Sequence, residues 1–559
     1  MKAFRKYIKY VAVGLMAMAA AGYYSSCTDL DENPYTFIDP NSFYTSASDL
    51  DAALVNTYRA FRDMAGARRT YVCKLEVSTD QGEPNYRKEQ PLLDNSCCWV
   101  DVNNATYTFS DLWADAYVVI NDANIVLGRM SGVELTDDEA KQLEGQARFL
   151  RAYAFYHIVR IYGGCPIPLT YTDGVEGLEM ARSSIDEVYD QIIEDLEYGA
   201  ENLPKRGEDD YDVWRASQGA CQALLGEVYL YKATIEASDN LSADTDLLQK
   251  SLNYSKAVID SDVYSLVSDY RNQFYWFNAD AKNNEESIFE LQYSNESGQT
   301  NSMGIDFGIG NNSGLQGVCG TYYNRYGPTC EVYLSYDEND TRRDMILTEF
   351  TDINGDTYYY DTDDQVWLQA DGVTPYTPES YAFHPLLNVK YYDRWADSET
   401  YRSQPGANFP MLRYAEVLLN YAEAANLLSA GNGLDQLNAV HTRAGLDAYS
   451  SMSQQEMDNA IIQERDWEFV GECKAYYDQL RKGVLGDRTE EFVYNNYLIY
   501  LKDEYVIDGT STSRKKLRFA NKMQIKPDKD FLWKIPTTDL DSNSLLEQNP
   551  DNTSLSLNY

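Results

Sequence analysis

The feature that most constrains the fold is a series of segments in which apolar residues recur every three or four positions. One segment opens with the capping pattern Thr136-Asp137-Asp138-Glu139, which is typical of a helix N-terminus. Apolar residues then follow the period of one helix face, at Leu143, Ala147, Leu150, Ala154, Ile158 and Ile161. Gly163, Gly164 and Pro166 end the pattern. The segment therefore predicts a long amphipathic helix.

The same design recurs towards both ends of the chain. Ser184 with Glu187 and Ser453 with Glu456 repeat the capping signal. Further helices are predicted over residues 49–64, 111–130, 213–233, 247–259, 412–428 and 434–443. Helices joined in succession by short or moderate turns predict stacked hairpins, and Leu225-Gly226-x-x-Tyr229 has tetratricopeptide spacing. We expect a mainly α fold of tetratricopeptide-like stacked helical hairpins.

Two stretches lack this helical period. Between residues 269 and 410, Tyr, Asn, Gly and Asp crowd together, and Asn354-Gly355 between residues 345–351 and 357–360 predicts a β-hairpin. A similar loop-rich stretch covers residues 68–105. Binding groups concentrate on loops that a rigid scaffold carries. We therefore expect a loop-rich, small-β insertion to form the binding face.

The N-terminus has the proportions of a secretory signal. Lys2, Arg5, Lys6 and Lys9 precede an apolar run of about a dozen residues, and a membrane-spanning helix needs about 20. Ser25-Ser26-Cys27 resembles a bacterial lipobox, in which Cys27 is acylated and becomes the first residue. We expect a signal peptide over 1–26 and a lipid-anchored tether over 27–45. The alternative is an ordinary signal peptide with an incidental cysteine.

Charge excludes one class of partner. The net charge is −41, and it becomes −45 once the four lysines and arginines of the first 26 residues are removed. Such a field repels phosphate backbones and anionic lipid, so nucleic-acid binding is not expected. No other apolar stretch approaches the length that spans a membrane, so the lipid would be the only membrane attachment. We expect residues 46–559 to form one domain. Its scaffold covers about 46–265 and 411–485, its variable region about 269–410, and its C-terminal segment 486–559.

Cofactor and catalytic motifs are weak. The eight other cysteines show no CxxC spacing, so zinc and thioredoxin-type sites are not expected. The chain has three histidines, and His157 lies in an apolar helical run that predicts a core position. Asp352, Asn354, Asp356 and Asp361 could bind calcium, but the glycine is out of EF-hand register and the hairpin explains the pattern. No cofactor is expected. Glu416 and Glu423 are expected in ion pairs with Arg413 or Arg465 rather than as a hydrolytic pair.

At this point several segments together resemble the SusD/RagB family of surface lipoproteins. The likeness rests on the lipobox with its acidic tail and on residues 147–153, 162–164, 214–217, 413–424, 443–446, 464–469, 535–536 and 548–550. These segments span nearly the whole mature chain. Lys474 stands where an arginine is common, and residues 477–480 interrupt the usual Asp-Leu-x-Arg. The resemblance implies four tetratricopeptide-like helical pairs that hold an irregular binding face.

The resemblance also implies a function. Members of this family capture nutrients, and this chain would bind a glycan outside the cell and deliver it to a SusC-like TonB-dependent outer-membrane transporter, without catalysis. The first alternative is a peptide or other nutrient receptor of the same family, because an acidic surface suits a cationic peptide as well as a neutral glycan. The others are a surface glycoside hydrolase and a scaffold that binds only its partner.

Candidate ligand contacts come from the loops. Aromatic rings stack on sugar rings, and nearby amides bond the hydroxyls. Trp99 with Asn103 resembles the early aromatic-plus-asparagine contact region of the family, and Tyr322, Tyr323 and Tyr326 form a second cluster in its variable middle. We expect these residues to touch the ligand.

Overall fold

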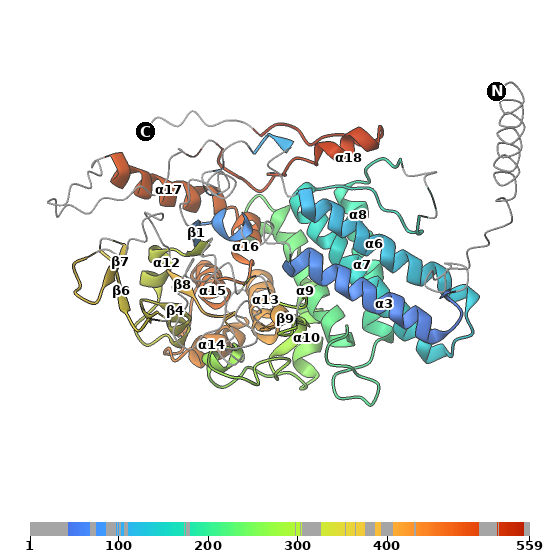
Figure 1. Cartoon of the computed structure of the whole chain (residues 1–559), viewed down its shortest axis with the longest axis horizontal. Helices are drawn as coiled ribbons and strands as arrows, with labels where there is room; N and C mark the ends of the chain where they lie inside the picture. Colours follow the sequence, from blue (N-terminus) through green and yellow to red (C-terminus); the bar gives the residue numbers. More distant parts are fainter. Residues whose placement is uncertain are drawn as a thin grey trace, which may run out of the picture.

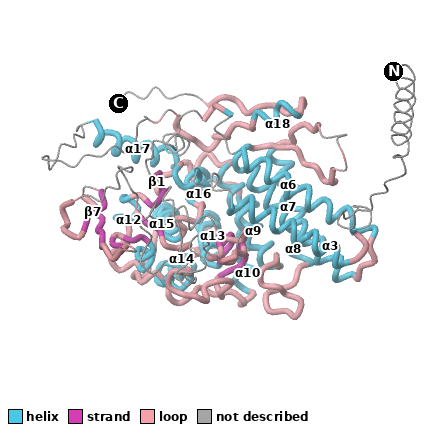
Figure 2. Tube along the Cα trace, viewed as in Figure 1, coloured by secondary structure: helices cyan, strands magenta, loops and turns pink. Residues whose placement is uncertain are grey.

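The computed structural model describes a chain made mainly of helices, which Figure 2 shows in cyan with short magenta strands between them. The described residues are 43–67, 74–84, 97, 99, 102–105, 110–172, 174, 179–296, 298–301, 303, 326–352, 354–363, 365–374, 386–392, 406–429, 432–501, 523 and 525–552. Cys27, Tyr322 and Tyr323 lie outside them. Among the described residues, no helix combines the length and apolarity that a membrane crossing requires.

The helices pack as successive pairs. Those of the first half are α3 (Ala47–Arg62), α6 (Ser110–Arg129), α7 (Asp137–Tyr162), α8 (Ile185–Asn202), α9 (Gln218–Ile235) and α10 (Thr245–Asp260). Those of the second half are α12 (Cys330–Ser335), α13 (Tyr414–Leu428), α14 (Leu434–Arg443), α15 (Gln454–Glu468), α16 (Ala475–Arg481), α17 (Leu485–Leu501) and α18 (Thr537–Ser542). Helix α3 packs on α6, α7 on α8, α9 on α10 and α13 on α14, and each pair packs on the next. This confirms the fold of stacked helical hairpins (Figure 1).

Capping fixes where the helices begin. Thr136, Ser184 and Ser453 each accept a hydrogen bond from the backbone three residues ahead, and the glutamate at that position bonds back to the cap. Each capping box satisfies two backbone donors that a helix start would otherwise leave without partners. All three predicted boxes are confirmed. Gly163, at φ 73°, lets the chain leave α7 in a left-handed conformation that a side chain would strain.

Short strands join segments that are far apart in the sequence. They are β1 (Gly82–Pro84), β2 (Ser287–Leu291), β3 (Tyr326–Pro328), β4 (Ile346–Leu347), β5 (Glu349–Thr351), β6 (Thr357–Asp361), β7 (Val366–Gln369), β8 (Leu387–Asn388) and β9 (Phe409–Arg413). The antiparallel pairs are β1 with β3, β2 with β9 and β4 with β8, and β5, β6 and β7 form a meander. Strands β5 and β6 flank Asn354-Gly355, which confirms the predicted hairpin.

Two helix starts were predicted too early. Helix α9 begins at Gln218 rather than 213, because the Ser217 hydroxyl caps it by accepting a hydrogen bond from the Ala220 amide. Helix α13 begins at Tyr414 rather than 412, because the residues before it pair with β2 as strand β9. Helix α17, which begins at Leu485, and helix α18 occupy parts of the C-terminal segment, for which no helix was predicted. In Figure 1 the helices α3, α6, α7 and α8 occupy the right-hand side of the molecule, β4, β6, β7 and β8 lie towards the left, and β9 lies near the centre.

Candidate functional site

The two predicted binding stretches meet in the structure. Strand β1, within residues 68–105, pairs with β3 of the variable region, and Glu83 lies opposite Gly327. The Thr329 amide donates to the Gln81 carbonyl, and the Thr329 hydroxyl donates to the carbonyl of Asp80. The two stretches therefore lie side by side, although more than 200 residues separate them in the sequence, and their role as the binding face stays a prediction.

The individual residues differ from the prediction, beginning with Trp99. Its side chain is 0 % exposed, and its indole NH donates to the Ser78 carbonyl at 3.2 Å. Its ring contacts the rings of Tyr476, Phe531 and Trp533. The prediction that Trp99 stacks on a ligand is wrong for this structure, because aromatic side chains of the C-terminal half already cover the ring. Trp99 is a core residue.

The other predicted contacts also have protein partners where the structure describes them. Asn103 is half-buried and joins the C-terminal segment: its Oδ1 accepts from the Asn552 amide at 2.8 Å, and its Nδ2 donates to the Asn552 carbonyl at 2.9 Å. Tyr326 lies in β3 and is only 1 % exposed, so its ring cannot present a face to a sugar, and that prediction too is wrong. For Tyr322 and Tyr323 the assignment stays a prediction.

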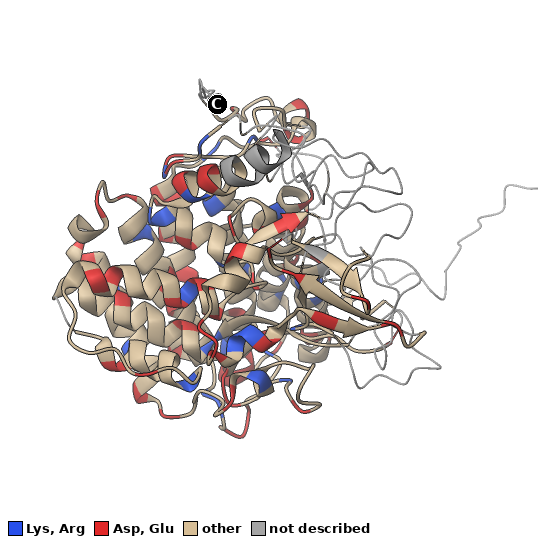
Figure 3. Ribbon diagram, turned by 90° about the vertical axis from the view of Figure 1, so that its left-hand side faces the viewer, with Lys and Arg blue, Asp and Glu red and all other residues tan. Residues whose placement is uncertain are grey.

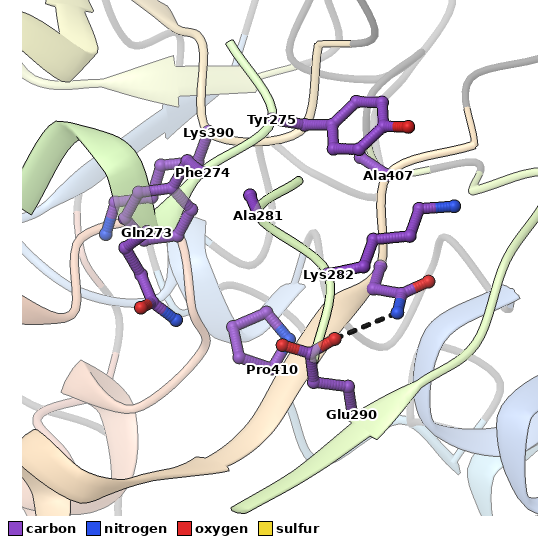
Figure 4. Close-up of a pocket in the computed structure, with 10 residues that line it drawn as sticks. Gln273, Phe274, Tyr275, Ala281, Lys282, Glu290, Lys390, Ala407 and Pro410 are labelled. Carbon is purple, nitrogen blue, oxygen red and sulfur yellow. Dashed lines mark hydrogen bonds between the residues drawn. The ribbon is translucent and has the colours of Figure 1, made fainter. Parts of the chain in front are cut away.

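A pocket opens beside the β2–β9 pair, in the variable region (Figure 4). Its cavity volume is about 20 Å³, which is room for about one water molecule, and most of its lining side chains are buried. It is lined by Gln273, Phe274, Tyr275, Ala281, Lys282, Glu290, Lys390, Ala407, Asn408 and Pro410. Pairing of the two strands places Glu290 opposite Pro410. The pocket thus combines aromatic, amide and charged groups at the end of two long loops.

The polar groups of this pocket are held in fixed positions. Asn408 Nδ2 donates to Glu290 Oε2 at 2.8 Å, and the Asn283 amide donates to the same oxygen at 3.0 Å. Burial raises the pKa of the Glu290 carboxyl, and these hydrogen bonds oppose that shift. Asn283 has a φ of 52°, a left-handed conformation that asparagine tolerates better than most residues. Lys282 Nζ donates to the Tyr293 carbonyl at 2.9 Å and lies 5.3 Å from the centre of the Tyr275 ring.

An aromatic run that was not predicted as a site begins in the pocket lining, with Phe274 and Tyr275, and continues outside the lining with Trp276 and Phe277. Residues 274–277 are Phe, Tyr, Trp and Phe, and their exposure increases along the run. Phe274 is buried, Tyr275 and Trp276 are half-buried, and Phe277 is 37 % exposed. Trp276 packs edge-on against Tyr392 at 5.9 Å. The signal for this site was present as four consecutive aromatic residues outside any helical period.

The carboxylates considered for hydrolysis are engaged elsewhere. Glu416 is 1 % exposed and forms ion pairs with Lys474 at 2.9 Å and Arg465 at 3.5 Å. Glu423 is 0 % exposed and pairs with Arg481 at 2.5 Å and Lys482 at 2.7 Å. The prediction of structural ion pairs is confirmed for Glu416 with Arg465, whereas Glu423 is ion-paired with other partners than the predicted Arg413 or Arg465. Neither carboxylate can reach a substrate from these positions.

The remaining polar candidates are also structural. His157 is 5 % exposed and stacks on Tyr153, and burial, with Arg160 and Lys474 nearby, holds the pKa of its imidazole well below the usual value. This confirms the predicted core position. Asp352 Oδ1 accepts from the Asn354 and Asp356 amides, which shapes the hairpin turn. Within the described residues, no three His, Cys, Asp or Glu side chains gather as a metal site.

Comparison with known proteins gives a consistent result along the chain. A family model described as the SusD family matches residues 285–551, and one described as starch-binding associating with outer membrane matches residues 30–230. SusD-like protein P2 of Formosa agariphila is 29 % identical over 496 residues, which cover 83 % of this chain and 89 % of that protein.

Solved structures share the fold. A SusD homologue from Bacteroides thetaiotaomicron superposes with a TM-score of 0.70 at 21 % identity, covering 90 % of this chain and 97 % of that one. A laminarin-binding SusD-like protein superposes with a TM-score of 0.67 at 21 % identity, covering 91 % of this chain and 100 % of that one. These structures are similar to this chain in architecture over about nine-tenths of its length.

Proposed function

Because the chain belongs to the SusD family, we propose that it is a lipoprotein of the outer membrane that binds oligosaccharides outside the cell. It passes the bound glycan to a SusC-like TonB-dependent transporter and catalyses no reaction itself. Cys27 carries the lipid, and residues up to 45 form the tether. A relative that binds laminarin supports a glycan as the ligand class.

The observation that carries this proposal is the meeting of an aromatic run with a pocket of fixed polar groups. An aromatic ring packs on the apolar face of a sugar, while amide and carboxylate groups bond its hydroxyls. Tyr275 lines the pocket and Phe277 is the exposed ring two residues further along the chain, and Asn408 with Glu290 supplies the polar partners. The site lies on loops beside a helical scaffold, where ligand contacts concentrate.

Loss of the rings is expected to weaken glycan binding. In Tyr275→Ala and Phe277→Ala, each truncation removes apolar contact worth about 1–3 kcal/mol, or roughly a five- to 150-fold loss of affinity. The melting temperature should change little for Phe277→Ala, because that ring is 37 % exposed. Calorimetry with laminarin oligosaccharides and a panel of other neutral glycans measures the affinity.

Tyr359→Ala provides the matched control, because Tyr359 is another exposed ring, 42 % accessible, on the separate β5–β6–β7 meander. Its affinity should equal that of the parent protein. Unchanged affinity in both Tyr275→Ala and Phe277→Ala would place the site elsewhere on the loop face. Binding of cationic peptides but of no glycan in the panel would favour the peptide-receptor alternative.

Anchoring is expected to depend on Cys27 alone. Stable attachment to a membrane needs more than one acyl chain, and the multiply acylated Cys27 would supply them. Cys27→Ala removes the thiol that the lipid would occupy. The variant should therefore leave the membrane fraction, whereas Thr28→Ala should remain in it. Membrane fractionation followed by mass spectrometry of the N-terminal peptide measures both results. Retention of Cys27→Ala in the outer membrane would contradict the lipoprotein assignment.

A further inference from the structure

We propose that a groove between helices α3 and α6 is a second sugar-binding site, which takes one or two uncharged sugar residues. The ligand class rests on the proposed function, whereas the site uses none of the residues assigned to glycan binding above. In Figure 1, α3 and α6 lie on the right-hand side of the molecule, and β9, which carries Pro410 of the first pocket, lies near the centre. The two sites are therefore separate.

The groove has room for a small ligand. Its cavity volume is about 250 Å³, against about 20 Å³ for the pocket beside β2 and β9. This lies just below the range of about 300–1,000 Å³ that is usual for pockets holding drug-sized ligands. Each residue that lines the groove is half-buried or exposed, so the groove is accessible from solvent. A ligand of one or two sugar rings matches this size.

Most of the groove lining is apolar. The rings of Phe43 and Tyr44 lie edge-on to one another with centres 5.0 Å apart, and both line the cavity together with Ala53 and Ile125. The Arg129 guanidinium lies 5.2 Å from the centre of the Tyr44 ring, a cation–π contact that helps to fix the ring in place. Aromatic and aliphatic groups of this kind pack against the apolar face of a sugar.

One polar pair crosses the groove from helix to helix. Asn56 Nδ2 of α3 donates to Asp122 Oδ2 of α6 at 2.9 Å, and Arg59 Nη2 donates to Asn56 Oδ1 at 3.2 Å. Burial raises the pKa of the Asp122 carboxyl, and Arg59 and the hydrogen bond from Asn56 oppose that shift. A carboxylate accepts several hydrogen bonds, so Asp122 can accept from sugar hydroxyls while it keeps its bond to Asn56.

The charges around the groove favour an uncharged ligand. A cation would meet the guanidinium groups of Arg59 and Arg129, which already lie against Asn56 and Tyr44. An anion would meet Asp122 and the field of a chain whose net charge is −41, and Figure 3 shows acidic residues spread over the helices and outer loops. A neutral sugar meets neither repulsion and can use both the rings and the amide–carboxylate pair.

The methyl groups of Ile125 report directly on the groove, because this side chain lines it. The test is an NMR titration of the purified protein, with isotope-labelled isoleucine methyl groups, against laminarin oligosaccharides and a panel of other neutral glycans. The Ile125→Val variant identifies the Ile125 signal. We expect this signal to shift in a saturable manner with at least one neutral glycan and to stay in place with lysine-containing peptides.

Three variants of the groove and one control test its residues. Tyr44→Ala and Asp122→Ala should each weaken the affinity read from the Ile125 signal about fivefold or more, because each removes one class of sugar contact. Ala53→Phe fills the groove but keeps its polar groups, so it should abolish the glycan-induced shift. Asp190→Ala, at an exposed position of α8, is the control and should leave the affinity unchanged.

The outcomes separate this inference from the proposed function. A glycan that binds by calorimetry without shifting the Ile125 signal would overturn the second site and leave glycan capture intact. Unchanged affinity in all three groove variants, or a shift caused by lysine-containing peptides and by no glycan, would also overturn it. A saturable shift that persists in Tyr275→Ala and Phe277→Ala supports a separate site, even if those variants show that the first pocket does not bind. Binding of no glycan in either measurement would refute both proposals.

Discussion

Trp99→Ala is expected to lower the free energy of unfolding by about 3–5 kcal/mol, the usual cost of truncating a buried tryptophan. The ring is 0 % exposed and lies near-parallel to Trp533, with centroids 5.6 Å apart, and edge-on to Phe531 at 4.9 Å. Removal of the indole leaves a cavity among these rings that rigid neighbours fill only in part. It also leaves the Ser78 carbonyl without its indole donor.

The backbone at Trp99 also adopts an unusual conformation. Its φ is 51°, a left-handed conformation that costs a bulky residue about 1–2 kcal/mol. Such a conformation persists only where the surroundings hold it. The contacts of the indole with Tyr476 and the C-terminal rings are therefore what hold Trp99 in this conformation. Trp99→Phe should lose less than Trp99→Ala, because a smaller cavity remains.

Urea unfolding followed by circular dichroism measures these losses. Phe277→Ala is the control, because its exposed ring should contribute little to stability and much to affinity. Trp99→Ala should show the reverse: a lower unfolding midpoint, with affinity reduced only as far as the loop is disturbed. If Trp99→Ala instead retained full stability and lost binding, the ring would leave the core to meet the ligand.

The helical scaffold could be predicted from sequence because its signals are local. Apolar period and capping depend on residues three or four apart, so Thr136 with Glu139 identifies a helix start without knowledge of the rest of the chain. A predicted helix boundary was wrong where a segment far away in the sequence pairs with the residues at that boundary. Helix α13 begins later than predicted because the residues before it form strand β9, which pairs with β2, more than 100 residues away. No local pattern carries that information.

The side-chain roles in the loops could not be predicted for the same reason. Trp99 and Phe277 both lie in aperiodic sequence outside the helical segments, yet one is buried and the other is exposed. The difference arises from the C-terminal residues Phe531 and Trp533, which cover Trp99 from over 400 positions away. An aromatic residue in a loop indicates that some surface will cover it, and only the fold decides between the protein and a ligand.

A network of buried charges also joins residues that are far apart in the sequence, and no local pattern predicts such a network. Glu468 is 0 % exposed at the end of α15, and its carboxylate meets Arg413 at 2.7 Å and Arg443 at 2.5 Å. Arg342 lies 3.2 Å from its other oxygen. Glu286 pairs with two of these arginines, at 2.7 and 2.8 Å, so the charges compensate one another across β2, β9, α14 and α15. The network connects the scaffold to the strands beside the pocket.

Glu468→Gln is expected to destabilise the protein by about 3–5 kcal/mol, because removal of one partner leaves buried arginines without full compensation. Arg59→Ala, in an exposed pair with Asp63 at 4.0 Å, should change stability by about 0.5 kcal/mol or less. Urea unfolding at neutral pH measures both changes in stability. A loss below about 1 kcal/mol for Glu468→Gln would mean that Glu286 and water compensate the arginines without it.

The pH dependence distinguishes lost charge from lost packing in this variant. Burial raises the pKa of the Glu468 carboxyl, but the guanidinium groups of Arg443, Arg413 and Arg342 outweigh it and hold the pKa well below its usual value. Stability from this group is therefore present above the unfolded pKa, about 4.3, and is lost as pH falls towards the folded one. The parent protein should lose stability between about pH 5 and 2, and the difference between parent and Glu468→Gln should narrow over that range. A difference that stayed constant with pH would assign the loss to packing rather than to charge.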